Sequence, residues 1–490
     1  MNTDPSNNPL ADDKLREECG IFGIWGKPEA AAFVALGLHA LQHRGQEASG
    51  IVINDGERFY MERREGLVGD QFSVGGPLDR LKGNRAIGHN RYSTTGGSLN
   101  RNIQHFFADV AIGDDDVGGI AIAHNGNLTN AHALRKRLVR KGSIFYSTSD
   151  SECIVHLVAT STAGNIVERL VDALKQVEGA YSLVALTRKK LIGVRDPLGV
   201  RPLVIGLVDG AYVLASETCA LDIIGAEFVR DVKPGELVVI SDAGLESFQP
   251  FPPARQRFCI FEYVYFARPD SLIDGQGVYD VRKAIGAELA RESPVEADLV
   301  VPVPDSGVPA ALGFAEAARI PFELGIIRNH YVGRTFIEPS DHIRHLGVKL
   351  KHNANRAQIA GRRVVLVDDS IVRGTTYKQI IKMVRDAGAT DVHMRIASPP
   401  TTDSCFYGVD TPEKANLLAA NYTIAEMCRF IGADSLGFIT INGLYRALRE
   451  TRRDGKTTRY CDACFTGEYP TTLSDRDAEV DSGQLSLLAM

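Results

Sequence analysis

The sequence contains no apolar run that approaches the roughly 20 residues of a membrane-spanning helix. Its net charge is only −6 over 490 residues, so it lacks the basic field with which proteins hold nucleic acid or an anionic membrane. Residues 1–18 are polar and acidic and lack the apolar core of a secretory signal. We therefore expect a cytoplasmic protein without nucleic-acid or membrane partners.

Because no secretory signal is present, the eight cysteines are expected to be thiols, metal ligands or a nucleophile rather than disulfides. The length predicts two domains. A proline-rich stretch at residues 248–254 marks the predicted boundary between them, so we place the domains at residues 19–254 and 255–470.

The most informative stretch is Val364-Val-Leu-Val-Asp-Asp-Ser-Ile-Val-Arg-Gly-Thr-Thr376. Its apolar residues without alternation predict a parallel strand that is buried on both faces. An amphipathic helix that ends at Gly388 is predicted to follow. Ligands of open α/β sheets bind just beyond such a strand, at the N-terminus of the next helix. The turn suits a phosphate, and Asp368 and Asp369 suit ribose hydroxyls or Mg²⁺.

This stretch resembles the phosphoribosyl-pyrophosphate (PRPP) motif of the type I phosphoribosyltransferases, which implies an α/β domain. The alternative is an ordinary strand and helix in which the two acidic residues at the end of the strand have no function. The resemblance implies one Mg²⁺ per subunit, held by Asp368, Asp369 and Ser306 of an upstream Asp-Ser-Gly turn. The PRPP contacts that it implies are Asp368, Asp369, Ser370, Gly374, Thr375 and Thr376.

Residues 328–356 form a long, mostly irregular segment with six Arg or Lys and two Asp or Glu. A loop of this length in a compact domain is usually functional or disordered. A solvated basic loop and a nucleic-acid contact are alternatives. The family resemblance favours a lid that closes on PRPP and excludes water, with Arg334 and Lys349 as contacts.

Five motifs follow one another in the first half of the chain. They are Cys19-Gly-Ile-Phe-Gly-Ile-Trp25, His43–Gly50, Gly88–Gly96, Ile122–Asn130 and Ser147–Glu152. Together they resemble the class II glutamine amidotransferases, which implies the N-terminal-nucleophile hydrolase fold, an αββα sandwich. In that family the nucleophile is the first residue of the mature protein, so Cys19 is expected to follow a propeptide of residues 1–18. A lone cysteine in a strand is otherwise most often a small buried residue.

A single residue that carries both a thiol and an α-amine suits this chemistry. The thiol, with a pKa near 8.5, needs a base, and an α-amine near 7.7–8.0 titrates close to working pH. Placing both on Cys19 guarantees their proximity.

The resemblance implies further roles in the same site. The Asn125 side chain and the Gly126 amide are expected to form the oxyanion hole, although Asn-Gly is also a strong hairpin signal. Arg91 is expected to bind the glutamine α-carboxylate and Asp150 the α-ammonium group. Arg44 and Gly45 are expected to shape the same pocket.

Cys461-Asp-Ala-Cys464 is a C-x-x-C pair, and single cysteines lie at positions 259 and 405. By spacing alone the pair could be half of a zinc site, a redox pair or a coincidence, and zinc is favoured. One subset of glutamine PRPP amidotransferases carries a [4Fe–4S] cluster on cysteines placed like these. The resemblance implies one structural cluster per subunit on Cys259, Cys405, Cys461 and Cys464, with zinc as the alternative. The other three cysteines, Cys153, Cys219 and Cys428, are expected to be core packing.

The two resemblances and the cysteine pattern together cover residues 19–470 and indicate the iron–sulfur type of glutamine PRPP amidotransferase, with an N-terminal propeptide. This implies an enzyme that hydrolyses glutamine and transfers the ammonia to PRPP, giving 5-phosphoribosylamine, glutamate and pyrophosphate, the first committed step of de novo purine biosynthesis. It also implies an apolar ammonia channel, feedback inhibition by purine nucleotides and a homotetramer. Residues 471–490 are expected to form a disordered tail.

Two other classes of protein would carry only one half of these motifs. A hexosamine-phosphate synthase would carry sugar-isomerase domains in place of the PRPP motif. A PRPP-sensing repressor would need no glutaminase residues and should show a basic extension, which is not visible.

Overall fold

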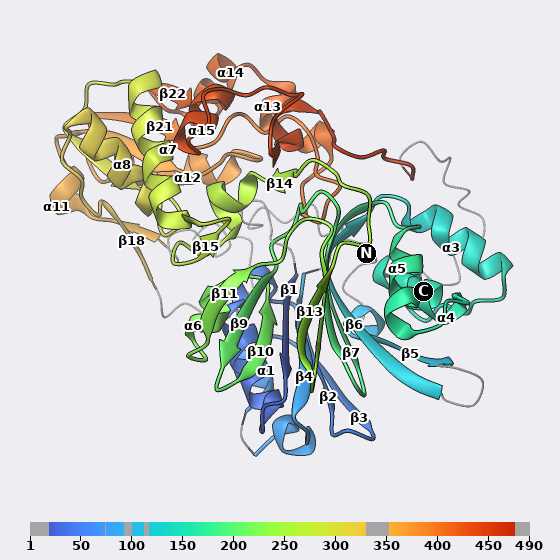
Figure 1. The fold of residues 1–490 in the computed structure, drawn as a ribbon. Coiled ribbons are helices and arrows are strands. Elements are labelled where there is room, and N and C mark those ends of the chain that lie inside the picture. Colours follow the sequence, from blue (N-terminus) through green and yellow to red (C-terminus); the bar gives the residue numbers. More distant parts are fainter. Residues whose placement is uncertain (1–18, 74, 93–99, 112–116, 330–351, 476–490) are drawn as a thin grey trace, which may run out of the picture.

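The computed structural model describes residues 19–73, 75–92, 100–111, 117–329 and 352–475, which form an N-terminal double sheet and a C-terminal α/β unit (Figure 1). The first sheet has seven antiparallel strands in the order β11 (Glu227–Asp231), β9 (Val204–Val208), β10 (Ala211–Ala215), β1 (Gly20–Trp25), β4 (Arg85–Arg91), β2 (Ala48–Asn54) and β3 (Phe59–Glu65). The second has six antiparallel strands in the order β13 (Gly244–Phe248), β12 (Leu237–Ser241), β8 (Leu191–Arg195), β7 (Gly179–Thr187), β6 (Val117–Leu128) and β5 (Phe106–Ala111).

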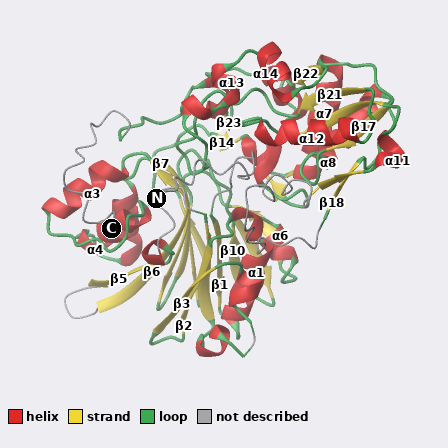
Figure 2. Ribbon diagram, turned by 180° about the vertical axis from the view of Figure 1, so that it is seen from behind, coloured by secondary structure: helices red, strands yellow, loops and turns green. Residues whose placement is uncertain are grey.

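The two sheets pack face to face because alternate strand residues point to opposite sides. In β1, Ile21 packs into the core between the sheets, whereas Phe22 and Ile24 pack against helices. The helices α1 (Ala30–Ala40), α2 (Val68–Gln71) and α6 (Cys219–Asp222) cover the seven-stranded sheet. The six-stranded sheet is covered by α3 (Ala131–Arg140), α4 (Ser151–Thr160) and α5 (Ile166–Leu174). The predicted αββα sandwich is therefore confirmed (Figure 2).

The C-terminal unit is built on a four-stranded parallel sheet. Its order is β17 (Leu299–Pro302), β20 (Arg363–Asp368), β21 (Asp391–Ile396) and β22 (Ser435–Phe438). On one face Val365 and Val367 pack with the helices α7 (Val278–Glu292), α8 (Val308–Ala318) and α15 (Ile441–Ala447). On the other, Val364 and Leu366 pack with α12 (Thr375–Asp386) and α14 (Ile424–Ile431). Burial on both faces explains the uninterrupted apolar sequence of β20.

Short elements complete the described part of the chain. Three two-stranded ribbons are β14 (Phe258–Cys259) with β23 (Tyr460–Cys461), β15 (Leu272–Ile273) with β16 (Gln276–Gly277), and β18 (Ile326–Arg328) with β19 (His352–Ala354). The short helical turns are η2 (Gln42–Arg44), η3 (Pro77–Arg80), η4 (Asn100–Asn102), η5 (Glu262–Phe266), η6 (Lys414–Asn416), α11 (Arg356–Ile359), α13 (Leu418–Asn421) and α16 (Ala463–Thr466). Within the described ranges no helix is both long and apolar enough to cross a bilayer.

Two features of the structure differ from the local sequence signals. Asn125-Gly126 does not form a hairpin turn but lies inside β6, which stays paired with β7 as far as Leu128 and Gly179. Gly126 has a φ of 144°, which a glycine adopts without strain, so the strand continues through it. Residues 471–475, expected in a disordered tail, form hydrogen bonds with the N-terminal half, for example from Ser474 Oγ to Glu178 Oε2 at 2.6 Å. Residues 476–490 lie outside the described residues.

Candidate functional site

Cys19 lies at the start of the seven-stranded sheet, directly before β1. Its side chain is buried, and its Sγ lies 3.7 Å from the carbonyl oxygen of Tyr92. The pairing of Gly20 with Asn90 brings the start of β1 beside the end of β4, where Arg91 lies. Burial lowers the pKa of Arg91, and the nearby charges of Cys19, Glu47 and Asp150 oppose that shift. The fold therefore brings Cys19, Arg91 and Asp150 into one electrostatic environment.

Asn125 is the most unusual polar residue of this region. The residue is 0 % exposed, and among the residues that the structure describes neither its Nδ2 nor its Oδ1 has a hydrogen-bond partner. A buried amide without partners costs about 1–3 kcal/mol, so such groups are rare unless a ligand uses them. The neighbouring Gly126 could not carry a side chain, because a Cβ there would lie 2.1 Å from the carbonyl oxygen of Ala180.

Asp150 is held by local donors at the N-terminus of α4. Its Oδ1 accepts a hydrogen bond from the Ser151 amide at 2.8 Å, and its Oδ2 accepts one from the Leu128 amide at 2.9 Å. These bonds attach the end of β6 to the start of α4. This second, structural role of Asp150 was not predicted from the sequence.

The buried polar residues next to Asn125 were also not predicted as part of the site. His124 Nδ1 lies 2.8 Å from Ser151 Oγ, and the His124 amide donates to Gln104 Oε1 at 2.7 Å. His89 of β4 bonds through Nε2 to the carbonyl oxygen of His124 at 3.1 Å, which joins the Cys19 side of the site to the Asn125 side. Burial, together with the charge of Arg91, lowers the pKa of His89 to about 3, so this histidine is neutral. The one feature of the sequence that could have indicated these residues is the position of His124 directly before Asn125.

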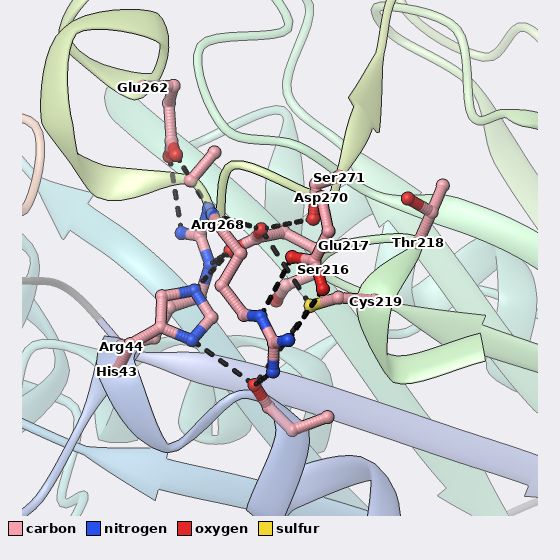
Figure 3. Close-up of polar contacts among 12 residues, drawn as sticks. His43, Arg44, Ser216, Glu217, Thr218, Cys219, Glu262, Arg268, Asp270 and Ser271 are labelled. Atoms are coloured by element: carbon pink, nitrogen blue, oxygen red, sulfur yellow. Dashed lines mark hydrogen bonds and ion pairs between the residues drawn. The ribbon is translucent and has the colours of Figure 1, made fainter. Parts of the chain in front are cut away.

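Gly45 and Arg44 have different surroundings, although both were expected to shape the glutamine pocket. A Cβ on Gly45 would lie 2.8 Å from the backbone carbon atoms of Asn90 and Arg91, so Gly45 does pack on the Arg91 strand. Arg44 instead occupies a fully buried ion network with Glu217 and Glu262, in which its NH2 lies 2.6 Å from Glu262 Oε2 (Figure 3). Arg44 therefore connects the two halves of the chain.

The second candidate site lies at the carboxyl end of β20. Asp368 and Asp369 are buried, and Ser306 Oγ of the neighbouring β17 turn lies 3.5 Å from Asp368 Oδ1. Ser370 Oγ donates to Asp369 Oδ2 at 2.8 Å. Tyr377 was not among the predicted site residues, yet its hydroxyl donates to Asp368 Oδ2 at 2.7 Å. Parallel pairing of β17 with β20 is what brings the two turns together.

The phosphate side of this site is the first turn of α12. Gly374 precedes the helix with a φ of 81°, and Thr375 and Thr376 form the first helical positions. This turn contains no acidic residue and no side-chain cap, so it suits an anion. The remaining two predicted PRPP contacts, Arg334 and Lys349, lie outside the described residues.

All four predicted cluster cysteines line one pocket. Cys259 of β14 is paired with Cys461 of β23, and Cys405 and Cys464 complete the set, with mainly apolar neighbours. Burial raises the pKa of Cys461 to about 12. Burial and the charges of the other three thiols raise the pKa of Cys464 well above its ordinary value. Among the described residues, no three His, Cys, Asp or Glu side chains converge closely enough to hold a metal ion.

The other cysteines lie apart from this pocket. Cys153 and Cys219 are buried among apolar residues, and burial raises the pKa of Cys153 to about 12. Cys428 is half-buried on α14.

Comparison with known proteins extends over both halves. A family model described as glutamine amidotransferase domain matches residues 111–222, and one described as phosphoribosyl transferase domain matches residues 270–398. The amidophosphoribosyltransferase of Rhizobium etli is 56 % identical over 491 residues, which cover 99 % of this chain and 98 % of that protein. The amidophosphoribosyltransferase of Bacillus subtilis is 47 % identical over 465 residues, 95 % of this chain and 96 % of its own length. The solved structure of B. subtilis glutamine PRPP amidotransferase complexed with ADP and GMP matches with a TM-score of 0.87 and 46 % identity, covering 93 % of this chain and 98 % of that one.

Proposed function

This chain belongs to the amidophosphoribosyltransferase family, and on that basis we propose that it works through a glutaminase site at Cys19 and a PRPP site at the end of β20. The reaction hydrolyses glutamine and transfers the ammonia to PRPP, giving 5-phosphoribosylamine, glutamate and pyrophosphate in purine biosynthesis. Both halves of the chain resemble the corresponding halves of its relatives, which supports two coupled sites on one polypeptide.

In the glutaminase site, the Cys19 thiolate attacks the side-chain carbonyl carbon of glutamine. The α-amine of the same residue, freed by removal of residues 1–18, accepts the thiol proton and later delivers it to the leaving ammonia. Arg91 pairs with the glutamine α-carboxylate, and Asp150 accepts from its α-ammonium group. The electrostatic proximity of Cys19, Arg91 and Asp150 supports these roles.

The observation that carries the glutaminase assignment is the buried amide of Asn125, which has no hydrogen-bond partner in the part of the chain that the structure describes. In a buried site, a donor without a protein partner is available to the oxygen that becomes negative in the tetrahedral intermediate. The Asn125 Nδ2 and the Gly126 amide are the two proposed donors.

In the PRPP site, Asp368, Asp369 and Ser306 would hold Mg²⁺. Two buried carboxylates beside a hydroxyl are the oxygen donors that a hard cation prefers, so the residues fit the ion. The bound ion would neutralise charge on the departing pyrophosphate. The first turn of α12, with Gly374, Thr375 and Thr376, would hold phosphate oxygens, and Arg334 and Lys349 would contact them from the segment at residues 330–351.

The four pocket cysteines would hold a [4Fe–4S] cluster. In a [4Fe–4S] cluster each of the four irons would bind one thiolate. The four cysteines would therefore lie farther apart than the ligands of a single zinc ion. Buried thiols whose pKa values are raised by burial and by one another need a positive group to become thiolates, and the irons of a bound cluster would supply it. When bound, the cluster would tie β14, the loop at Cys405 and the C-terminal segment together.

Metal analysis tests the cluster directly. We expect about four iron and four sulfide per chain in protein purified without oxygen, and loss of both in the Cys464→Ala variant but not in Cys428→Ala. Stoichiometric zinc without sulfide would support the alternative metal.

Three further properties are proposed from the family resemblance: feedback inhibition by purine nucleotides, a homotetramer and a cytoplasmic location. The B. subtilis structure was solved with ADP and GMP, which supports the first for this chain. An apolar passage between the sites would deliver ammonia without protonation.

The test of the whole proposal is glutamate release from glutamine, measured with and without PRPP and Mg²⁺ on anaerobically purified protein. A rise in release with PRPP, together with pyrophosphate, supports coupled sites. Release that is indifferent to PRPP would mean a glutaminase with another acceptor. No release from protein that begins at Cys19 by mass and holds its metal would favour a PRPP-binding regulator.

A further inference from the structure

A loop of the C-terminal half touches the oxyanion strand of the N-terminal half. This cysteine loop, residues 404–409, contains Cys405. The carbonyl oxygen of Phe406 accepts a hydrogen bond from Asn127 Nδ2 at 3.1 Å, and that of Tyr407 accepts one from Arg201 Nε at 3.1 Å. The next residue is Gly408, so three consecutive loop residues contact the N-terminal half, and two of them, Phe406 and Gly408, contact β6 directly after Asn125.

Gly408 makes the closest of these approaches. A Cβ on Gly408 would lie 3.1 Å from the carbonyl carbon of Gly126 and 3.2 Å from its Cα and its oxygen. A Cβ on Gly126 would collide with the backbone of Ala180 and the ring of His124. Gly126 therefore contacts both β7 and the cysteine loop, and a methyl group on Gly408 would push against its backbone by a few tenths of an ångström.

A second segment holds the loop in this position. The C-terminal strap, residues 469–475, follows Cys464 and runs back to the N-terminal half. Tyr469 donates to the carbonyl oxygen of Ser404 at 2.6 Å, and Asp475 Oδ2 accepts from the His132 amide at 2.7 Å. The strap thus joins the cysteine loop to α3, which directly follows the oxyanion strand.

We propose that Gly408 and Phe406 are positioning residues of the glutaminase site, which hold the Gly126–Asn127 backbone in the geometry of the oxyanion hole. The inference rests on the proposed role of Asn125 and Gly126. Stabilisation by an oxyanion hole depends on donors that are fixed before the charge develops. A displacement of the Gly126 amide by a fraction of an ångström weakens it while leaving glutamine binding at Arg91 and Asp150 intact. The cysteine pocket thereby acts on glutamine hydrolysis through its loop.

Domain packing alone is the competing explanation for the same contacts. Under that explanation, a disturbed loop would affect both activities of the enzyme, or neither. The positioning role predicts a selective loss in the hydrolysis of glutamine, because free ammonia can reach the PRPP site without Cys19 or Gly126.

The test compares Gly408→Ala with Gly56→Ala in the full-length mature enzyme. Gly56 has a φ of 109°, close to the 112° of Gly408, but a Cβ there would meet nothing within 4 Å. Both substitutions place an alanine at a positive φ, but only the Gly408→Ala methyl group would contact Gly126. Asn127→Ala removes the hydrogen bond to Phe406 without adding an atom, and serves as a second variant if Gly408→Ala does not fold.

We expect Gly408→Ala and Asn127→Ala to lower kcat for glutamine hydrolysis about 10- to 100-fold, less than or equal to the loss of a whole oxyanion donor. The KM for glutamine and the ammonia-dependent release of pyrophosphate from PRPP should stay within about threefold. Gly56→Ala should match the wild type in all three.

Two outcomes would overturn the inference. One is an unchanged kcat in both variants while Asn125→Ala is impaired, since the oxyanion hole would then not depend on the loop. The other is an equal loss of the glutamine- and ammonia-dependent activities, which would indicate domain packing. Wild-type glutamine hydrolysis by Asn125→Ala would instead contradict the proposed oxyanion hole itself.

Discussion

Buried polar side chains decide the chemistry at the scale of single residues. Asn125 is buried and has no side-chain hydrogen-bond partner among the described residues, and the charges of Cys19 and Asp150 act on the buried Arg91. In the second site, the carboxylates Asp368 and Asp369 are almost completely buried. Burying polar and charged side chains lowers the stability of the protein, so we interpret each of these residues by the ligand that it would contact.

Replacing Cys19 with alanine should separate the two activities. The Cys19→Ala variant should lose glutamine-dependent pyrophosphate release by at least about 10³-fold, because no other group can form the covalent intermediate. Ammonia-dependent release should persist, since the PRPP site is unchanged. The control is Cys428→Ala, which removes a half-buried thiol on α14. Retained glutamine hydrolysis in Cys19→Ala would refute the nucleophile assignment.

Tyr377→Phe tests the support of the magnesium site. The substitution removes the hydroxyl that donates to Asp368 Oδ2 and keeps the buried ring. Loss of such an outer hydrogen bond typically costs about 10- to 100-fold in metal affinity or activity. We expect a rise in the Mg²⁺ concentration required for half-maximal activity, with the PRPP-independent glutaminase unchanged. Tyr422→Phe, on an exposed tyrosine, is the matched control and should show no change.

At the scale of elements, α3 depends on a residue far away in the sequence. Its N-cap residue Asn130 makes no side-chain cap, and Asp475 supplies the missing acceptor to the amides of His132 and Ala133. A carboxylate at a helix N-terminus both accepts hydrogen bonds and complements the helix dipole. The C-terminal strap therefore completes a helix of the N-terminal half.

Asp475→Ala should weaken the first turn of α3. A lost cap costs about 0.5–2 kcal/mol, so hydrogen exchange of the His132 and Ala133 amides should accelerate by roughly 2- to 30-fold. Asp475→Asn retains an acceptor oxygen and should lie between the alanine variant and the wild type. Unchanged exchange in Asp475→Ala would show that the strap does not cap the helix in solution.

At the scale of the whole molecule, the two halves share a buried ion network. Arg44 and Glu217 come from the N-terminal half and Glu262 from the segment after the predicted boundary (Figure 3). Arg201 also reaches Glu262, with 3.3 Å between its NH1 and Oε1. All four side chains are fully buried, so the charges are satisfied only when both halves are assembled.

Glu217→Gln should loosen this junction. Removing one partner of a buried ion pair typically costs about 3–5 kcal/mol, because the other charge remains buried. We expect a lower midpoint of urea unfolding than in the wild type, whereas Glu246→Gln on the exposed strand β13 should change nothing. An unchanged midpoint would mean that the network adds no stability.

The pH dependence of this difference follows from the pKa of Glu217. Burial raises the pKa of a carboxyl, but the charges of Arg44 and His43 outweigh it and hold the pKa well below the ordinary 4.5. A depressed pKa contributes stability that is present above 4.5 and is lost as the pH falls through the folded-state value. The stability gap between the wild type and Glu217→Gln should therefore be present above about pH 4.5 and narrow as the pH falls further.

The sequence by itself determined the two fold classes and most candidate residues, because these depend on local patterns. The uninterrupted apolar runs before Asp368 and after Cys19 both fit strands buried on both faces, and each strand packs into two cores in the fold. The motifs around Cys19, Arg91, Asn125 and Asp150 are short and contiguous, so their positions could be identified without knowing what packs beside them.

Only the tertiary structure decided which distant segments meet. The Asn-Gly pair of β6 favours a hairpin locally, but pairing with β7 keeps it extended. Tyr377 on Asp368, Asp475 on α3 and Gly408 against Gly126 join residues that no local pattern relates. The physical reason is that hydrogen-bond and packing partners are chosen by the assembled fold, whereas strand and helix preferences are already present in neighbouring residues.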